Sequence, residues 1–333
     1  MYQSKFEKIT LNFKQSSGTS RGVLTTKDSW IISLWRTDSP GIIGKGEASI
    51  IKTLSPDWSD IYEVQLQEVT MKINDYIDNI ATLHQFPSIQ FALETAKLDL
   101  DNGGYYQIFK TKTKKIPING LVWMGTEDFM MNQLKEKIEL GFRCIKMKIG
   151  AIDFESELSL LKFIRSKYSK HDMTIRVDAN GAFSFEEALD KLDVLTKYDI
   201  HSIEQPIMAG QLDEMAKLCS STPLPIALDE ELIGVQNSRD KKKLLQTINP
   251  QYIILKPSLI GGISGTDEWI EIAEALGIDW WITSALESNV GLNAIAQYTA
   301  TKNNLLPQGL GTGSLYTNNI EPFLEVKDGF LWL

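Results

Sequence analysis

The 333-residue sequence has few of the features that mark membrane, secreted and nucleic-acid-binding proteins. No uncharged apolar run reaches about 18 residues, which argues against a transmembrane helix, and the first residues lack the apolar core of a signal peptide. Only two cysteines, Cys144 and Cys219, argue against a disulfide framework and favour a reducing compartment. The formal net charge of -9 disfavours nucleic acid and anionic membranes as partners. We therefore expect a cytoplasmic protein.

Several common catalytic patterns are missing as well. The sequence contains no Walker phosphate loop and no dinucleotide-binding glycine fingerprint. Its three histidines, His84, His171 and His201, fall in predicted loops, at helix ends or at the start of a strand, where structural or surface roles are expected. The glycine-rich run 309–313 lacks the lysine and the helix of a phosphate loop, so it predicts at most an anion-binding turn.

The pattern of the chain changes near residue 115. Before this point, strand-like runs such as 8–13 and 29–35 precede helix-like stretches around 60–79 and 89–101, which predicts an α+β domain. From residue 116 onward, apolar strands alternate with amphipathic helices, which predicts an α/β fold with a (β/α)8-type barrel.

The barrel elements can be assigned approximate bounds. Strands are predicted at 116–123, 143–149, 174–179, 201–204, 225–229, 251–256, 280–284 and 306–309, and helices at 128–140, 154–168, 185–197 and 266–276. The extended tail, about 316–333, is expected to return to the first domain. The predicted division is a capping domain at 1–115, completed by this tail, and a barrel at 116–315.

Acidic residues end three consecutive predicted strands, at intervals of about 25 residues, which is the length of one strand, one helix and two loops. They are Asp178, Glu204 and Asp229. One such acid alone would be read as a helix cap or a loop charge. Because side chains alternate across a strand, all three take the last inward position, and the C-terminal rim of a barrel brings such positions together. Three carboxylates suit a hard cation, Mg²⁺ with Mn²⁺ as a possible substitute, better than zinc.

Lysines end the predicted strands on either side of these acids. Lys148 precedes them and Lys256 follows them. A cation between two lysines suggests removal of a proton next to a carboxylate, by a lysine that is neutral when it acts. Lys146 shares a strand face with Lys148 and either supplies positive charge or pairs with a rim carboxylate. Arg176 shares the inward face of Asp178 and is expected to support the site.

Five short motifs resemble the enolase superfamily and, more narrowly, its muconate-lactonizing subgroup. In order, they are Lys146-Met147-Lys148, Asp178-Ala179-Asn180-Gly181, Glu204-Gln205-Pro206, Asp229-Glu230 and Lys256-Pro257. The resemblance spans essentially the whole chain. It implies that Asp178, Glu204 and Asp229 bind the metal, while Lys148 acts as the acid/base on one face of the substrate and Lys256 lies on the other.

Three further segments, 17–24, 284–292 and 309–316, are similar to the o-succinylbenzoate synthases of this subgroup. That resemblance implies a magnesium-dependent syn-dehydration of 2-succinyl-6-hydroxy-2,4-cyclohexadiene-1-carboxylate to 2-succinylbenzoate, through an enediolate, in menaquinone biosynthesis. Lys148 would remove the proton and then protonate the departing hydroxide. Lys256 would stay charged and stabilise the enediolate across its face.

The same resemblance implies a set of substrate contacts. They are Lys146, Asn180, Ser284, Glu287, Gly311, Thr312 and, in a capping loop that closes over the substrate, Arg21. An arginine in such a loop can hold a carboxylate through two hydrogen bonds. The alternative interpretation of Arg21 is a solvated surface residue.

Other functions stay open at this point. N-acylamino acid racemases and dipeptide epimerases of the same superfamily use two lysines on opposite faces. Dipeptide epimerases resemble one another in an Asp-x-Asp after the eighth strand that holds the substrate ammonium, and 309–313 contains no acid. A non-catalytic metal-binding scaffold is the remote alternative. The expected partner is a small-molecule carboxylate substrate, and a homo-oligomer is compatible with the sequence.

Overall fold

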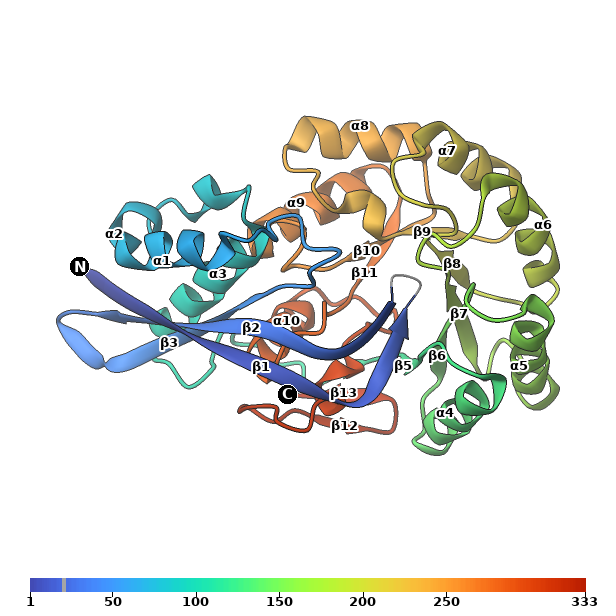
Figure 1. Cartoon of the computed structure of the whole chain (residues 1–333), viewed down its shortest axis with the longest axis horizontal. Helices are drawn as coiled ribbons and strands as arrows, with labels where there is room; N and C mark the ends of the chain where they lie inside the picture. Colours follow the sequence, from blue (N-terminus) through green and yellow to red (C-terminus); the bar gives the residue numbers. More distant parts are fainter. Residues whose placement is uncertain (20–21) are drawn as a thin grey trace.

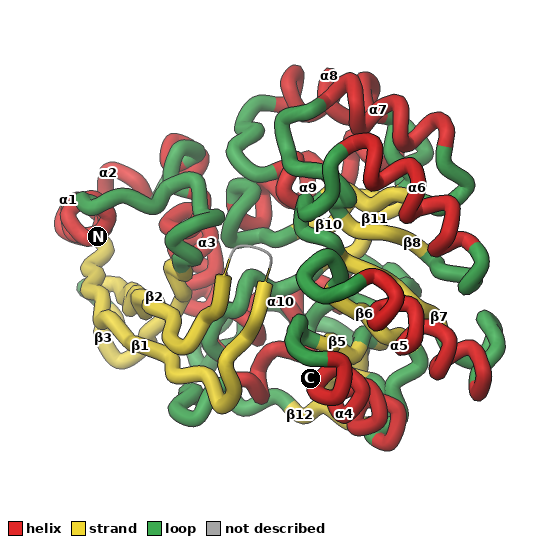
Figure 2. The backbone as a smooth tube through the Cα atoms, turned by 45° about the vertical axis from the view of Figure 1, so that its right-hand side comes forward, coloured by secondary structure: helices red, strands yellow, loops and turns green. Residues whose placement is uncertain are grey.

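An antiparallel sheet with its helices lies on one side of the molecule, and a curled parallel sheet ringed by helices lies on the other (Figure 1). The structure is a computed structural model that describes residues 1–19 and 22–333. Figure 2 shows the strands of the first side reaching toward the end of the parallel sheet. The described part of the chain contains no helix that is both long enough and apolar enough to cross a membrane.

The N-terminal side consists of three long antiparallel strands, paired in the order β1-β2-β3, and the helices that follow them. These elements are β1 (Tyr2–Thr19), β2 (Gly22–Arg36), β3 (Ser39–Ser49), α1 (Tyr62–Met71), α2 (Ile73–Tyr76), the 3-10 turn η1 (Ile80–Leu83) and α3 (Pro87–Asp101). We call residues 1–115 the cap. The strands-first, helices-after order predicted for this part is the one observed.

Seven parallel strands form the curled sheet of the second side, in the order β11-β10-β9-β8-β7-β6-β5. They are β5 (Gly120–Val122), β6 (Cys144–Lys148), β7 (Thr174–Asp178), β8 (Ser202–Glu204), β9 (Ile226–Leu228), β10 (Tyr252–Leu255) and β11 (Asp279–Ile282). The helices between and after them are α4 (Glu127–Glu139), α5 (Phe154–Lys167), α6 (Phe185–Thr196), α7 (Leu212–Ser221), α8 (Ser238–Ile248), α9 (Gly262–Ala275) and α10 (Asn289–Thr301), with 3-10 turns η2 (Glu230–Leu232) and η3 (Gly311–Leu315).

Two residues close this sheet into a barrel. The backbone carbonyl of Gln308 accepts a hydrogen bond from the N–H of Asn119 (3.0 Å), and the backbone N–H of Gln308 donates one to the carbonyl of Pro117 (2.8 Å). Gly309 bonds the opposite edge, where its N–H donates to the carbonyl of Ile282 (2.8 Å). The predicted eighth strand at 306–309 is therefore wrong in extent, since only bridges form here. Pro307 has no N–H with which to extend the ladder.

The C-terminal tail contacts both sides of the molecule. The N–H of Thr317 donates to the carbonyl of Asn12 in β1 (2.9 Å). Further on, β12 (Glu325–Lys327) pairs with β13 (Phe330–Trp332), which pairs with β4 (Lys115–Pro117), and Leu331 is fully buried in the barrel core. The division into a cap at 1–115, a barrel at 116–315 and a tail that completes the cap stays a prediction.

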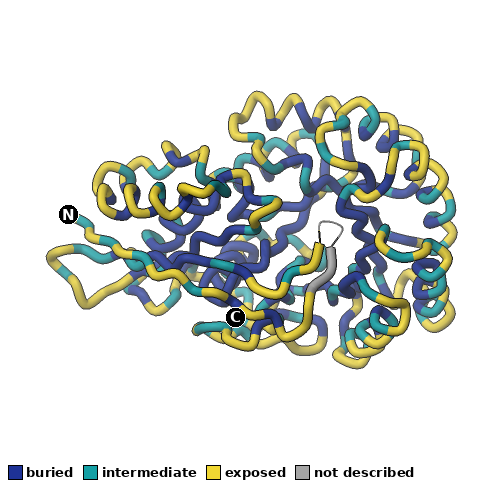
Figure 3. Tube along the Cα trace, in the orientation of Figure 1, coloured by how far each residue is buried: buried dark blue, intermediate teal, exposed yellow. Residues whose placement is uncertain are grey.

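Burial follows the sheets. Figure 3 shows buried residues along the sheets and the inner faces of the helices, and exposed residues on the outer faces. Two further boundaries differ from the prediction. The predicted strand 116–123 divides into β4, which pairs with the tail, and β5, which belongs to the barrel. Helix α9 begins at Gly262 and not at residue 266. Its first N–H groups bind Glu94 of the cap (2.5 Å from the N–H of Ile263), a partner that local sequence does not reveal.

Helix α3 packs directly on the backbone of β3. A Cβ atom added to Gly46 would lie 1.9 Å from the carbonyl oxygen of Ala92, and one added to Gly44 would lie 2.0 Å from that of Ala96. The short distance lets Trp30, on β2, pack with Leu93 in one buried cluster. This contact holds the cap sheet and its longest helix together.

We predict that Gly46→Ala destabilises the protein by more than about 2 kcal/mol and lowers Tm by about 4 °C or more, since backbone atoms must move apart to admit the methyl group. Gly41→Ala is the matched control, because a Cβ atom there would meet nothing within 4 Å. Thermal unfolding of both variants provides the measurement. Equal Tm values for the two would contradict the proposed packing constraint.

Candidate active site

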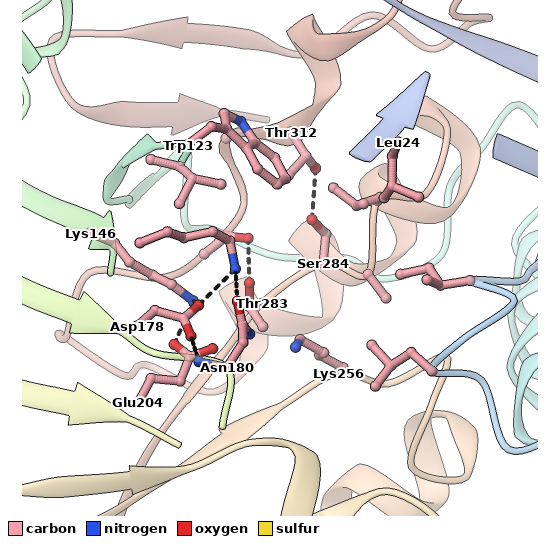
Figure 4. A pocket seen from close by; sticks show the side chains of 18 of the residues that line it. Leu24, Trp123, Lys146, Asp178, Asn180, Glu204, Lys256, Thr283, Ser284 and Thr312 are labelled. Atoms are coloured by element: carbon pink, nitrogen blue, oxygen red, sulfur yellow. Dashed lines mark hydrogen bonds and ion pairs between the residues drawn. The ribbon is translucent and has the colours of Figure 1, made fainter. Parts of the chain in front are cut away.

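A cavity of about 290 Å³ lies at the C-terminal ends of the barrel strands, beside the cap. The barrel lines it with ionisable and polar side chains from successive strands and with some apolar ones, and the cap contributes mostly apolar residues (Figure 4). The cap residues at the cavity are Gly22, Val23, Leu24, Ile51, Thr53 and Leu54. Such a cavity has the size and the mixed lining of a small-molecule site.

Neighbouring strands place lysines against acids on one side of the cavity. In the sheet register, Lys148 of β6 lies beside Asp178 of β7, and Asp178 lies beside Glu204 of β8. The Nζ atom of Lys148 is 3.0 Å from Oδ2 of Asp178, and that of Lys146 is 2.9 Å from the same atom. Lys146 also pairs with Glu204. These residues take the inward positions that strand alternation predicts.

Lys256 reaches the cavity from the other side, as Figure 4 shows. It follows β10, and its ammonium group pairs with Oδ2 of Asp229, which follows β9. The N–H of Asp229 donates to Oε1 of Gln205 (3.2 Å), a fully buried side chain whose Nε2 donates to Glu231 (3.1 Å). Gln205 therefore fixes the backbone from which the third acid extends.

Asn180 connects the lysine side of the site to the next loop. Its Oδ1 accepts a hydrogen bond from Lys148, and its Nδ2 donates to Glu230 (3.0 Å). The backbone of Asn180 is left-handed (φ 45°), a conformation that asparagine tolerates better than most residues. This turn places the side-chain amide of Asn180 next to Lys148.

The charges of the site strongly affect one another. Burial alone would raise the pKa of Asp178 and of Asp229. The ammonium groups of Lys146, Lys148 and Lys256 hold the pKa of Asp178 below its ordinary range, and those of Lys256 and Lys146 do the same for the pKa of Asp229. Burial and the neighbouring charge of Asp178 raise the pKa of Glu204. Burial would lower the pKa of Lys146, yet the surrounding carboxylates raise it.

The acids also retain capacity for a cation. Within the described ranges, no three Asp, Glu, His or Cys side chains form a ready-made metal cluster, and lysine ammonium groups lie against an oxygen of each acid. However, Oε1 of Glu204 and Oδ1 of Asp229 are buried without a hydrogen-bond partner. Buried carboxylate oxygens without a donor are costly, and a hard divalent cation would satisfy both. The donor set therefore fits magnesium.

Hydroxyl groups and glycines form the end of the cavity nearest β11. Oγ of Ser284 and Oγ1 of Thr312 are 2.7 Å apart, and both residues line the cavity together with Gly309 and Gly311. Leu286, beside them, has a left-handed backbone (φ 63°). These groups can bind a polar or anionic part of a ligand.

Four residues named from the sequence are not among the described residues that line the cavity. The first is Asp229, whose carboxylate pairs with Lys256 of the cavity wall. Arg176 is buried beneath the site, where its guanidinium carbon lies 3.8 Å from the ring centroid of Trp281 and Nη1 donates to Pro307 (2.7 Å). Glu287 accepts hydrogen bonds from Ser258 and from the N–H of Ala285. Arg21 lies outside the described residues.

Sequence reasoning missed other cavity residues. The ring centroid of Trp123 lies 5.8 Å from Nζ of Lys148, a cation–π distance. Its position at the end of the first predicted barrel strand was the available signal. Leu24, Ile51 and Leu54 come from the cap and carry no local pattern that indicates a site.

Comparison with known proteins adds independent information. The family described as Enolase C-terminal domain-like matches residues 130–333. The o-succinylbenzoate synthase of Desulfotalea psychrophila is 44% identical over 98% of this chain and 97% of its own length. The crystal structure of MenC from the same organism covers 100% of this chain and 99% of its own, with a TM-score of 0.88 and 40% identity. The dipeptide epimerase of Enterococcus faecalis complexed with Mg and the dipeptide L-Leu-L-Tyr shares the fold, with a TM-score of 0.84, 21% identity, and coverage of 99% and 96%.

We predict that Lys146→Met lowers the free energy of unfolding by about 3 kcal/mol or more, because it leaves Asp178 and Glu204 buried with less compensating charge. Lys8→Met is the matched control, since Lys8 also contacts two acids, Asp28 and Glu63, but its side chain is 43% exposed. Urea denaturation of both variants provides the comparison. A Lys146→Met variant as stable as Lys8→Met would contradict the importance of this ion pair.

Proposed function

The chain belongs to the enolase superfamily, and we propose that it acts within it as an o-succinylbenzoate synthase. The enzyme is a hydro-lyase of menaquinone biosynthesis that removes water from 2-succinyl-6-hydroxy-2,4-cyclohexadiene-1-carboxylate to give 2-succinylbenzoate. The observation that carries this conclusion is the end-to-end similarity to the Desulfotalea psychrophila enzyme. The cavity with lysines on two sides is consistent with it.

Lys148 is the residue we assign to proton transfer. Its Nζ atom borders the cavity, where Asp178 and Asn180 orient it from below and Trp123 covers it. A neutral Lys148 would remove the proton next to the substrate carboxylate. In a syn-elimination, the resulting ammonium group would then protonate the departing hydroxide to give water. Lys148 would thus end the reaction neutral, as it began.

Lys256 has an electrostatic role in this proposal. Its ammonium group enters the cavity opposite Lys146, and Asp229 holds it in place. A positive charge there stabilises the negative charge that develops across the ring face when the proton leaves. The apolar side chains of Leu24, Ile51 and Leu54 complete the enclosure and exclude water from the ring.

We assign Mg²⁺ to Asp178, Glu204 and Asp229, with Mn²⁺ as a possible substitute. The unpartnered oxygens of Glu204 and Asp229 support this assignment. When bound, the cation supplies positive charge at the substrate carboxylate, which makes the neighbouring proton more acidic. The three acids come from consecutive strands, so the barrel itself sets their spacing.

The remaining substrate contacts are assigned by chemistry. Ser284, Thr312 and the backbone of Gly311 would bind the succinyl carboxylate at the hydroxyl-lined end of the cavity. Arg21 is assigned to a substrate carboxylate by the family resemblance alone, since it lies outside the described residues. We also propose a cytoplasmic enzyme, because a reducing compartment keeps Cys144 and Cys219 as the free thiols observed.

N-acylamino acid racemisation is the second candidate. It is favoured by Lys148 and Lys256, which reach one cavity from separate strands and could exchange protons on opposite faces of a substrate. Dipeptide epimerisation has less support, because a substrate ammonium would find no acid within residues 309–313.

The function is tested by a direct assay. We expect the purified protein with Mg²⁺ to convert the cyclohexadiene substrate to 2-succinylbenzoate, with a kcat/KM well above that for N-succinylamino acids or dipeptides. Ultraviolet absorbance follows formation of the aromatic product. Rapid racemisation of an N-succinylamino acid without dehydration would instead support the second candidate.

We predict that Glu204→Ala weakens Mg²⁺ binding by about 10-fold or more, because two remaining carboxylates hold the ion poorly. Isothermal titration calorimetry of Mg²⁺ measures this without reference to turnover. Glu186→Ala, which removes an exposed acid in the first turn of α6, is the control. An unchanged Kd in Glu204→Ala would refute the metal assignment.

A further inference from the structure

Two glutamates of the cap bind the N-termini of two barrel helices. Glu94 of α3 accepts hydrogen bonds from the N–H of Ile263 (2.5 Å) and the hydroxyl of Ser264, at the start of α9. Glu47 of β3 accepts bonds from the N–H groups of Ser288 and Gly291 (2.8 Å each), at the start of α10. A carboxylate is favourable there, because it satisfies unpaired N–H groups and the positive end of the helix dipole.

Glu47 is held without access to water. Its exposed fraction is 0%, and the hydroxyl of Ser288 also donates to it. The buried ammonium group of Lys27 interacts electrostatically with Glu47 and with Glu287. A charge in this position needs every one of its partners, since removing one leaves the rest of the cluster uncompensated. The geometry at the start of α10 is therefore narrowly defined.

The loop that Glu47 holds leads directly to the cavity. Leu286, two residues before Ser288, lines the cavity with a left-handed backbone (φ 63°). Such a conformation is unfavourable for a leucine and persists only when surrounding contacts impose it. Those contacts are a hydrogen bond from Tyr316 to the carbonyl of Leu286 (2.6 Å), the Glu287–Ala285 bond (2.7 Å) and the Glu47 contacts to Ser288.

Glu94 provides a natural comparison at the same junction. Its partners, Ile263 and Ser264, do not line the cavity, and Gly261 and Gly262 separate them from the segment that bears Lys256. Glu94 thus makes the same kind of hydrogen bonds between the cap and the barrel, but the residues that it binds are farther along the chain from any residue that lines the cavity.

We propose that Glu47 is a positioning residue for substrate binding. By holding the start of α10, Glu47 imposes the backbone geometry of Leu286 and Ser284, which border the cavity. Glu47 itself lies more than two hundred residues earlier in the chain. Glu47 itself touches no substrate. The inference rests on the proposed function in that this cavity binds the substrate and its product.

The test compares Glu47→Gln with Glu94→Gln. Each variant places an amide NH2 against helix N–H donors and loosens the junction, so we expect a lower Tm in both. The KM of dehydration and the Kd of 2-succinylbenzoate, from calorimetry, should rise about 10-fold in Glu47→Gln alone, with kcat changed less than about threefold. Unchanged KM and Kd in Glu47→Gln, or equal rises in both variants, would overturn the inference.

A milder variant keeps the inference testable if Glu47→Gln does not fold. Ser288→Ala removes the hydroxyl that donates to Glu47 and leaves both backbone bonds. It should raise the Kd about threefold, and an unchanged Kd would then overturn the inference. The wild-type protein separates the two proposals. A wild type that does not dehydrate the substrate contradicts the proposed function, whereas an active wild type with an unaffected variant contradicts only the role of Glu47.

Discussion

The compensation of buried charge at the barrel rim is the constraint on which the rest of the structure depends. Asp178, Glu204 and Asp229 are nearly excluded from water, and so are the three lysines that face them. Isolated ions could not be buried this way, because the desolvation cost would exceed any local gain. Opposite charges on neighbouring strands must therefore lie side by side, and the parallel register of β6, β7 and β8 pairs them in this way.

The cap turns this charged rim into an enclosed site. Its own core, built where α3 packs on β3, holds its sheet and its longest helix together. Its apolar residues face the charged wall across a cavity, so a ligand with a ring and a carboxylate finds both kinds of surface. Carboxylates from the cap bind the starts of α9 and α10, which links the placement of the cap to the loops that follow β10 and β11. The position of the cap therefore affects both the enclosure of the cavity and the geometry of the loops that follow β10 and β11.

Much of this was open to sequence reasoning because it depends on local periodicity. Alternating strands and helices predicted the barrel, and the inward parity of Asp178 and Lys148 placed them at its rim. Predictions were wrong where local periodicity does not decide the outcome. The eighth strand reduces to bridges at Gln308 and Gly309, beside Pro307, which has no N–H for a ladder. Helix α9 starts early because Glu94, distant in the chain, supplies acceptors for its first N–H groups.

The sequence by itself determined which ionisable groups share the rim, since side-chain alternation and strand spacing are properties of the chain alone. Only the tertiary structure decided how these groups pair and what surrounds them. The pairing of Lys146 with two acids, the removal of Glu287 and Arg176 from the cavity wall, and the inclusion of Trp123 all depend on packing between segments that are far apart in sequence. Glu47 illustrates the same limit, because a buried acid acquires its partners only when cap and barrel meet.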